Sequence, residues 1–160
     1  MGVDKVYDGE IYERSDCYNV RFIVMWSCYQ GQKIDGMPLA WLHTADLSED
    51  GYMNPWGTAC FIGFKGRCPY LVEEISSIDE AGKKFCIRFY YYAFQQDVMI
   101  SQALDLASKD VFGVTFAECP FYKGFYLDGY YIKMVVYGCT NYMLCKLGVY
   151  GGGGGPNRPR

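Results

Sequence analysis

The sequence has 160 residues, of which 51% are apolar and 21% charged, and its formal net charge at pH 7 is -3. This length and composition are typical of one globular domain, and the mild negative charge gives no electrostatic basis for binding nucleic acid or an anionic membrane. No apolar run approaches the roughly 18 residues of a membrane span, and the N-terminal residues lack the apolar segment of a signal peptide. We therefore expect neither a nucleic acid nor a membrane as a partner, and the localisation stays unknown.

The first predicted strand covers residues 20–26, a nearly continuous apolar run that ends in Ser-Cys-Tyr-Gln-Gly at 27–31. An apolar run that breaks into a turn is typical of a buried strand. Residues 39–43 favour a short helix or strand. The following loop, 48–57, contains Asp-Gly and Asn-Pro, which each favour a chain reversal. A second short strand is predicted over residues 58–64, where glycines let the backbone approach another group closely.

Two helices follow these strands. Aromatic and apolar residues at helical spacing predict a helix over residues 80–96. A second helix is predicted to begin with Ser101 as its N-cap and to end at Gly113, a residue type that commonly terminates helices.

The C-terminal third is predicted to contain an irregular aromatic segment over residues 116–128, a strand over 130–137 and a last strand that ends at Leu147. The tail over residues 150–160 is rich in glycine, proline and arginine, and we expect it to be disordered. The order strand, strand, helix, helix, strand predicts a single α/β domain over residues 1–149, with a mostly parallel central sheet flanked by helices.

Eight cysteines occur without a Cys-x-x-Cys pair, and the sequence has one histidine. This pattern gives little support to a closed zinc site, so we expect no metal. Buried thiols are the simplest interpretation, and disulfides stay open as an alternative. The glycines form neither a phosphate-binding loop nor a dinucleotide fingerprint, so we expect no cofactor.

Cys28 is the first candidate catalytic residue, because it follows the first predicted strand. Side chains at the carboxyl ends of strands in an α/β sheet face the crevice where sites form. A cysteine in that position is activated by a partner base and by nearby backbone N–H groups. The alternative is that Cys28 is the last buried residue of its strand.

Four segments resemble the caspase and gingipain clan of cysteine peptidases, especially its gingipain-like branch. They are Trp-Ser-Cys-Tyr-Gln-Gly at 26–31, Cys-Phe-Ile-Gly-Phe at 60–64, the helical segment 101–107 and Met-Val-Val-Tyr-Gly at 134–138. The resemblance implies a caspase-like three-layer sandwich, of which this chain would be the C-terminal part. It also implies hydrolysis of a peptide or protein substrate, with Cys28 as the nucleophile.

One departure from the clan concerns the general base. The clan takes its base from a His-Gly pair that precedes the cysteine, and no histidine precedes Cys28 here. His43 is the candidate replacement, since the turn-rich loop lies beside it, and a structural, hydrogen-bonded histidine is the alternative. Gly31, Gly63 and Trp41 are the candidate binding residues. Either the chain belongs to a longer protein that supplies the base, or the dyad is incomplete.

The competing hypothesis is a non-catalytic structural or interaction module. The sequence has 16 tyrosines, and tyrosine suits surfaces where a ring is buried and a hydroxyl stays wet. Such a module would pair through a sheet edge or a tyrosine-rich surface with a second copy or with a partner chain that completes the sheet. The sequence leaves open whether the protein is an enzyme.

Overall fold

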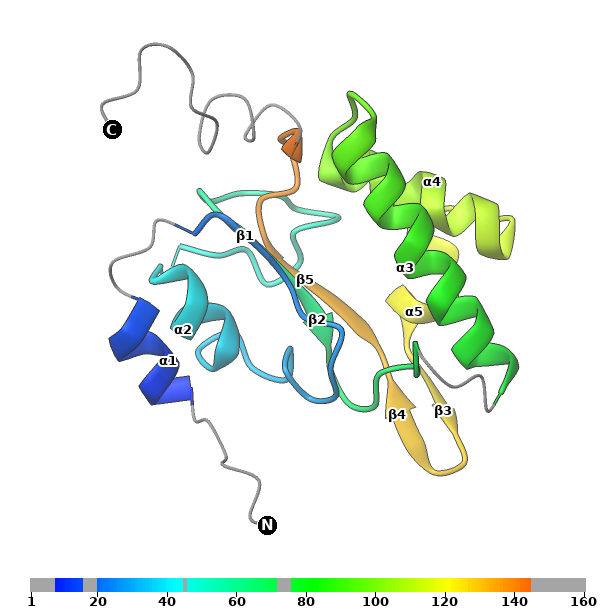
Figure 1. The fold of residues 1–160 in the computed structure, drawn as a ribbon, viewed down its shortest axis with the longest axis horizontal. Helices are drawn as coiled ribbons and strands as arrows, with labels where there is room; N and C mark the ends of the chain where they lie inside the picture. The colour runs from blue at the N-terminus through cyan, green and yellow to red at the C-terminus, as the bar shows by residue number, and fades with distance from the viewer. Residues whose placement is uncertain (1–7, 16–19, 45, 72–75, 145–160) are drawn as a thin grey trace. The chain divides into compact units, whose positions relative to one another are not determined.

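The computed structural model describes residues 8–15, 20–44, 46–71 and 76–144 (Figure 1). These residues fall into two compact units, one within Met1–Cys68 and Pro120–Cys139 and the other within Pro69–Cys119 and Thr140–Arg160. We call them the sheet unit and the helical unit. The single domain over residues 1–149 stays a prediction, and the predicted disordered tail lies outside the described residues.

The sheet unit is built on a three-stranded sheet in the order β1-β2-β5, visible in Figure 1. The strands are β1 (Phe22–Val24), β2 (Cys60–Phe64) and β5 (Met134–Gly138). β1 runs parallel to β2, and β5 runs antiparallel to it. Every residue of β2 and β5 is buried, whereas β1 is half-buried. The two buried strands therefore carry the core of this unit.

The predicted mostly parallel sheet and three-layer sandwich are wrong for the described residues. Besides the small mixed sheet, these residues contain a two-stranded antiparallel sheet of β3 (Phe125–Leu127) and β4 (Tyr130–Ile132). Asp128 and Gly129 both have positive φ between these strands, which is the conformation of a tight hairpin turn. The predicted strand over 130–137 is thus two strands in different sheets. An apolar run does not reveal strand direction, because buried parallel and antiparallel strands have the same composition.

Three short helices complete the sheet unit: α1 (Asp8–Ser15), α2 (Met37–Leu42) and α5 (Pro120–Lys123). The segment 39–43 is therefore mainly helical. The core cluster consists of buried side chains from α2, from the segment between α2 and β2, and from β2 and β5. Half-buried apolar side chains pack against it. Its buried members are Leu42, Leu47, Ala59, Phe61, Val135 and Tyr137.

The loop over residues 48–57 protects one edge of the sheet. An isolated bridge joins Leu47 to Gly57 and closes the loop. The Gly138 N–H donates to the Ser48 carbonyl at 2.7 Å, and the Gly51 N–H donates to the Val136 carbonyl at 2.8 Å. These bonds occupy backbone groups of β5 that a further strand would need.

The helical unit contains α3 (Ser77–Gln95), α4 (Ile100–Phe112) and the short 3₁₀ helix η1 (Phe116–Glu118). The helices predicted over residues 80–96 and from about 101 to 113 are confirmed. Ser76 caps α3 by accepting the Asp79 N–H, and Gly113 ends α4 with φ 74°. The ring of Phe85 packs 6.0 Å from that of Phe116 between centroids, and both residues are buried.

Two predictions at the ends of α4 need correction. The N-cap is Met99, whose N–H donates to the Gln102 side chain at 2.9 Å, and Ser101 already lies inside the helix. The predicted last strand is absent from residues 140–144, and its remainder lies outside the described residues. The carbonyls of Thr140 and Tyr142 instead accept the N–H groups of Ser101 and Ile100. This segment therefore satisfies the first amide groups of α4, which have no partner within the helix.

Candidate functional site

Cys28 lies in a turn that follows β1 and is hydrogen-bonded to the exit of β2. The Tyr29 N–H donates to the Gly66 carbonyl at 2.7 Å, and the Gly31 N–H donates to the Phe64 carbonyl at 3.0 Å. Because β1 and β2 are parallel, their carboxyl ends lie at the same edge of the sheet. The turn at 28–31, which we call the Cys28 turn, therefore lies at the edge where the sequence predicted a site.

The sulfur of Cys28 has a backbone hydrogen-bond donor. The Cys68 N–H points at the Cys28 Sγ, with 3.2 Å between nitrogen and sulfur. Cys28 is partly exposed and carries a free thiol. A donor in this position stabilises negative charge on the sulfur. A nucleophilic thiol needs a partner base in addition to such a donor.

The residue after Cys28 has a strained backbone. Tyr29 has φ 62°, in the left-handed region, and its side chain is 53% exposed. A residue other than glycine pays roughly 1–2 kcal/mol for that conformation. Such strain concentrates at functional sites, where it holds a neighbouring group in a defined position. Here the neighbouring group is the thiol of Cys28.

His43 lies in a different environment. It caps the C-terminal end of α2 with φ 51°, and its N–H donates to the Leu39 carbonyl at 2.9 Å. Its imidazole stacks on the ring of Tyr12 in α1, with 4.3 Å between centroids and 25° between planes. Within the described part of the chain, no hydrogen bond joins His43 to Cys28. The catalytic pairing of these two residues stays a prediction.

Gly31 and Gly63 pack closely against each other. A Cβ atom on Gly31 would collide with the Val135 side chain and press on the backbone of Gly63. The buried Tyr137 hydroxyl donates to the Gly31 carbonyl at 2.7 Å. These contacts give the two glycines a packing role, because they let the Cys28 turn lie directly on the sheet. Their binding role stays a prediction.

Trp41, the third candidate binding residue, lies in α2 and is partly buried. Its indole N–H is buried and has no hydrogen-bond partner among the described residues. A buried donor left unpaired costs about 1–3 kcal/mol.

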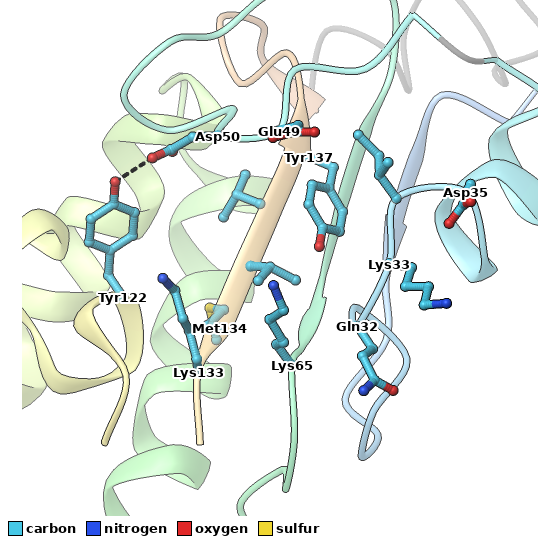
Figure 2. Close-up of a pocket in the computed structure, with 13 residues that line it drawn as sticks. Gln32, Lys33, Asp35, Glu49, Asp50, Lys65, Tyr122, Lys133, Met134 and Tyr137 are labelled. Carbon is cyan, nitrogen blue, oxygen red and sulfur yellow. Dashed lines mark hydrogen bonds between the residues drawn. The ribbon is translucent and has the colours of Figure 1, made fainter. Parts of the chain in front are cut away.

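A pocket of about 430 Å³ opens on the sheet unit, and sequence reasoning did not find it. Figure 2 shows that charged side chains from three directions surround it, with strand β5 running through the view. Its lining residues are Gln32, Lys33, Ile34, Asp35, Glu49, Asp50, Lys65, Tyr122, Lys133, Met134, Val135, Val136 and Tyr137. The volume is within the range of small-molecule sites.

Two lysines lie side by side in this pocket. The Lys65 N–H donates to the Lys133 carbonyl at 2.8 Å, one register step beyond the paired residues Phe64 and Met134. Cross-strand neighbours project from the same face of a sheet, and Figure 2 shows both amine ends directed into the pocket. Neither ammonium group forms an ion pair with a described carboxylate. Like charges in this position repel each other.

One wall of the pocket is fixed by a tyrosine and an aspartate. The Tyr122 hydroxyl donates to Asp50 Oδ2 at 2.5 Å. Asp50 Oδ1 accepts the N–H groups of Tyr52 and Met53 at 3.2 and 3.1 Å. Burial, and then the hydrogen bond to Asp50, raise the pKa of Tyr122. This wall is therefore held by a charge-assisted bond between residues 72 positions apart in sequence.

Asp50, from the predicted turn-rich loop over residues 48–57, thus orients Tyr122. The sequence held one signal for the pocket: Lys133 interrupts the apolar run of residues 130–137. The other lining residues come from distant segments, so no local pattern brings them together.

Two features are absent from the described residues. No three histidine, cysteine or acidic side chains gather as a metal site would require. No described helix has the length and apolar character to cross a membrane.

Comparisons with family models, with curated proteins and with solved structures found no match to this chain.

Proposed function

We propose that Cys28 is the nucleophile of a cysteine peptidase that acts on a peptide or protein substrate. The observation that carries the proposal is the geometry of the Cys28 turn. It places a partly exposed thiol at the carboxyl edge of two parallel strands, with the Cys68 N–H at 3.2 Å from the sulfur. The resemblance of residues 26–31 to the nucleophile segment of caspases and gingipains supports the same assignment.

The proposed chemistry follows from the groups at this edge. The Cys28 thiolate attacks the carbonyl carbon of a peptide bond, the carbon–nitrogen bond breaks, and the amine leaves with a proton supplied by the acid form of the base. The acyl group stays on sulfur as a thioester until water hydrolyses it. The N–H groups of Tyr29 and Gly31 already donate to carbonyls, so the N–H of Cys28 itself is the proposed donor to the oxyanion that forms in each step.

The proposal needs a base that accepts the thiol proton. His43 is the one histidine in the sequence, and its imidazole stacks on the ring of Tyr12. The alternative source is an imidazole from another polypeptide segment that pairs with β1. That strand is half-buried and pairs on one side with β2, and no described strand pairs with its other side.

The first test is the rate at which iodoacetamide alkylates each cysteine, resolved by mass spectrometry, between about pH 5 and pH 9. Cys139 is the internal reference, because it is also a partly buried thiol of the sheet unit. We expect Cys28 to react faster than Cys139, because the Cys68 N–H donates to its sulfur. Equal rates that follow an ordinary thiol would rule out an activated Cys28 in this chain.

Variants identify the base and the reaction. Slower labelling of Cys28 in His43→Ala would assign the base to His43. Unchanged fast labelling in that variant would point to the donor groups of the turn and to a base from another segment. Cleavage of a peptide library by the wild type and its loss in Cys28→Ser would establish the hydrolysis itself.

A second candidate function is an interaction module, and one observation favours it. Helix α3 exposes Ile87, Tyr90, Tyr91 and Phe94, which are 39–59% exposed. Positions three and four apart share a helix face, so these four side chains form one apolar stripe. The rings of Tyr90 and Phe94 stack at 5.6 Å between centroids. Clustered exposed aromatic groups are typical of protein–protein contacts.

In this second candidate the partner is another copy of the chain, joined through α3. Sedimentation velocity over a concentration series measures the association. We expect a dimer in the wild type and a monomer in the double variant Tyr91→Ser, Phe94→Ser, with Lys109→Ser as an exposed control. A wild type that stays monomeric at every concentration contradicts this function.

A further inference from the structure

We propose that the pocket beside Lys65 and Lys133 binds a small molecule through a dianionic group, such as a phosphoryl group or a pair of carboxylates. This site is separate in its residues from the Cys28 turn, and the proposal does not depend on the peptidase assignment. Neither Cys28 nor His43 lines the pocket.

The charges of the two lysines carry the proposal. Their backbones are hydrogen-bonded to each other just beyond the paired ends of β2 and β5, and their ammonium groups share the pocket without a described carboxylate partner. Two cations held together in this way repel, and an anion between them removes that repulsion and gains charge-assisted hydrogen bonds to both. Lys33 and Asp35, on the segment after the Cys28 turn, add one positive and one negative charge to the lining.

The opposite wall restricts what the rest of the ligand is. Glu49 and Asp50 line that wall, and the Asp50 carboxylate is already bound by the Tyr122 hydroxyl and by two backbone N–H groups. Glu49 remains as an exposed carboxylate. A second anionic group on the ligand would meet that negative charge. The arrangement therefore fits a ligand with its dianion at the lysines and a hydroxyl or amine at Glu49.

The size and lining of the pocket agree with a small ligand. Its volume of about 430 Å³ holds a molecule of metabolite size. Its lining includes Val135 and Val136, which are buried residues of β5. Tyr137 also belongs to the lining, and its hydroxyl proton is already donated to the Gly31 carbonyl. Recognition of a charged ligand therefore falls to the charged side chains of the lining.

Isothermal titration calorimetry with inorganic phosphate and with malonate tests the proposal, with sodium chloride at matched ionic strength as the blank. We expect saturable binding of at least one probe, and the stronger of the two identifies the dianion. Lys65→Met and Lys133→Met should each weaken that binding by about tenfold or more, since each removes a charge-assisted hydrogen bond. Lys109→Met, outside the pocket lining, should leave binding unchanged.

Glu49→Gln should change phosphate binding in the opposite direction from the lysine variants. Removing its negative charge from the rim should strengthen phosphate binding by about two- to threefold, because it removes repulsion across a solvated pocket. Lys65 is exposed, so its replacement leaves the fold intact even if Lys133→Met does not fold. The proposal is overturned if neither probe binds saturably, or if the pocket variants and the Lys109 control change binding equally.

Discussion

The two compact units differ in how many described non-glycine residues have a strained backbone. The described residues outside glycine with positive φ are Tyr29, His43 and Asp128, and all three belong to the sheet unit. In the described part of the helical unit, positive φ occurs at Gly113, where it ends a helix at little cost. Strain accumulates where a fold positions groups for a task. His43 ends a helix and Asp128 lies in a hairpin turn, so Tyr29, next to Cys28, is the described residue whose strain supports the proposed site in the sheet unit.

The helical unit shows the opposite character. Its aromatic residues follow the helical period, with Phe85 and Phe89 buried and Ile87 and Phe94 exposed. In the helical unit, the local sequence preferences agree with the observed structure. In the sheet unit, Tyr29 at the candidate site takes a backbone conformation that its residue type disfavours. Agreement between local preference and fold is expected of a scaffold, and departure is expected of a site.

The largest expected effect is on the core of the helical unit. Phe85 is buried, and its ring lies 6.5 Å from that of Phe112 and 6.0 Å from that of Phe116 between centroids. Phe85→Ala should lower the free energy of unfolding by about 3–5 kcal/mol, because it leaves a cavity. Urea denaturation measures this change. Ile87→Ala, on the exposed side of the same helix, should change it by no more than about 0.5 kcal/mol.

Hydrogen exchange then tests whether the units behave separately. If Phe85→Ala accelerates exchange in peptides of α3 and α4 more than in peptides of β2 and β5, the units have distinct stabilities. Equal acceleration in both would show that they unfold as one body and would weaken the comparison.

Alanine substitutions at two glycines, one in each unit, test the cost of backbone strain. Gly66 has φ 108°, and a Cβ atom there would collide with the carbonyl of Tyr131, whereas Gly113 has φ 74° and open space around it. Gly113→Ala should cost about 1 kcal/mol from backbone strain alone. Gly66→Ala adds a backbone collision and should cost about 3 kcal/mol. The midpoints of urea denaturation of the two variants give the difference between their costs in stability. Equal costs would contradict the backbone collision expected at Gly66.

Gly66→Ala has a further consequence at the Cys28 turn. The Gly66 carbonyl accepts the Tyr29 N–H, so a shift of Gly66 moves the strained residue next to the thiol. We expect the alkylation rate of Cys28 to change in Gly66→Ala and to stay constant in Gly113→Ala.

Alkaline pH should weaken the helical unit through Cys86. Burial raises the pKa of this thiol from 9.0 to about 11. Between these two values the unfolded chain loses the proton and the folded chain keeps it, so the stabilisation present below pH 9 is lost as pH rises. The free energy of unfolding should fall by up to about 1.4 kcal/mol per pH unit in that window.

Cys86→Ala isolates this contribution from the tyrosines and other thiols that also titrate at high pH. The slope of unfolding free energy against pH, measured under reducing conditions, should become shallower in the variant between pH 9 and pH 11. Parallel curves for wild type and variant would show that Cys86 does not titrate in this way.

The helices could be predicted from sequence because their signals are local. The 3.6-residue period of α3 and α4 and the terminating Gly113 are contained within single segments. Strands β1 and β2 were also visible as apolar runs. Their pairing was not, since each partner of a buried strand lies far away in sequence and composition does not encode direction. The Asp128-Gly129 turn was a local hairpin signal that the apolar run around it concealed.

The candidate sites divide in the same way. The Cys28 turn could be predicted, because a cysteine at the end of an apolar run is a local pattern. The donor at its sulfur could not, since the Cys68 amide approaches from a segment 40 residues away. The pocket depends on contacts such as that of Tyr122 with Asp50, which only the folded chain creates. Lys133, a charged residue within an apolar run, was the sequence feature that indicated the pocket.

The smallest predicted effect concerns a hydrogen bond from a tyrosine to an aspartate, of which each unit has an example. The Tyr122 hydroxyl donates to Asp50 in a half-buried setting, and the Tyr92 hydroxyl donates to Asp110 at 2.8 Å on an exposed surface. Tyr122→Phe should lower the free energy of unfolding by about 1–2 kcal/mol, because a buried bond to a charged acceptor is lost. Tyr92→Phe should cause no change beyond experimental error, because water replaces the hydroxyl. A larger loss in Tyr92→Phe would reverse the comparison and make the helical unit the one that depends on its polar contacts.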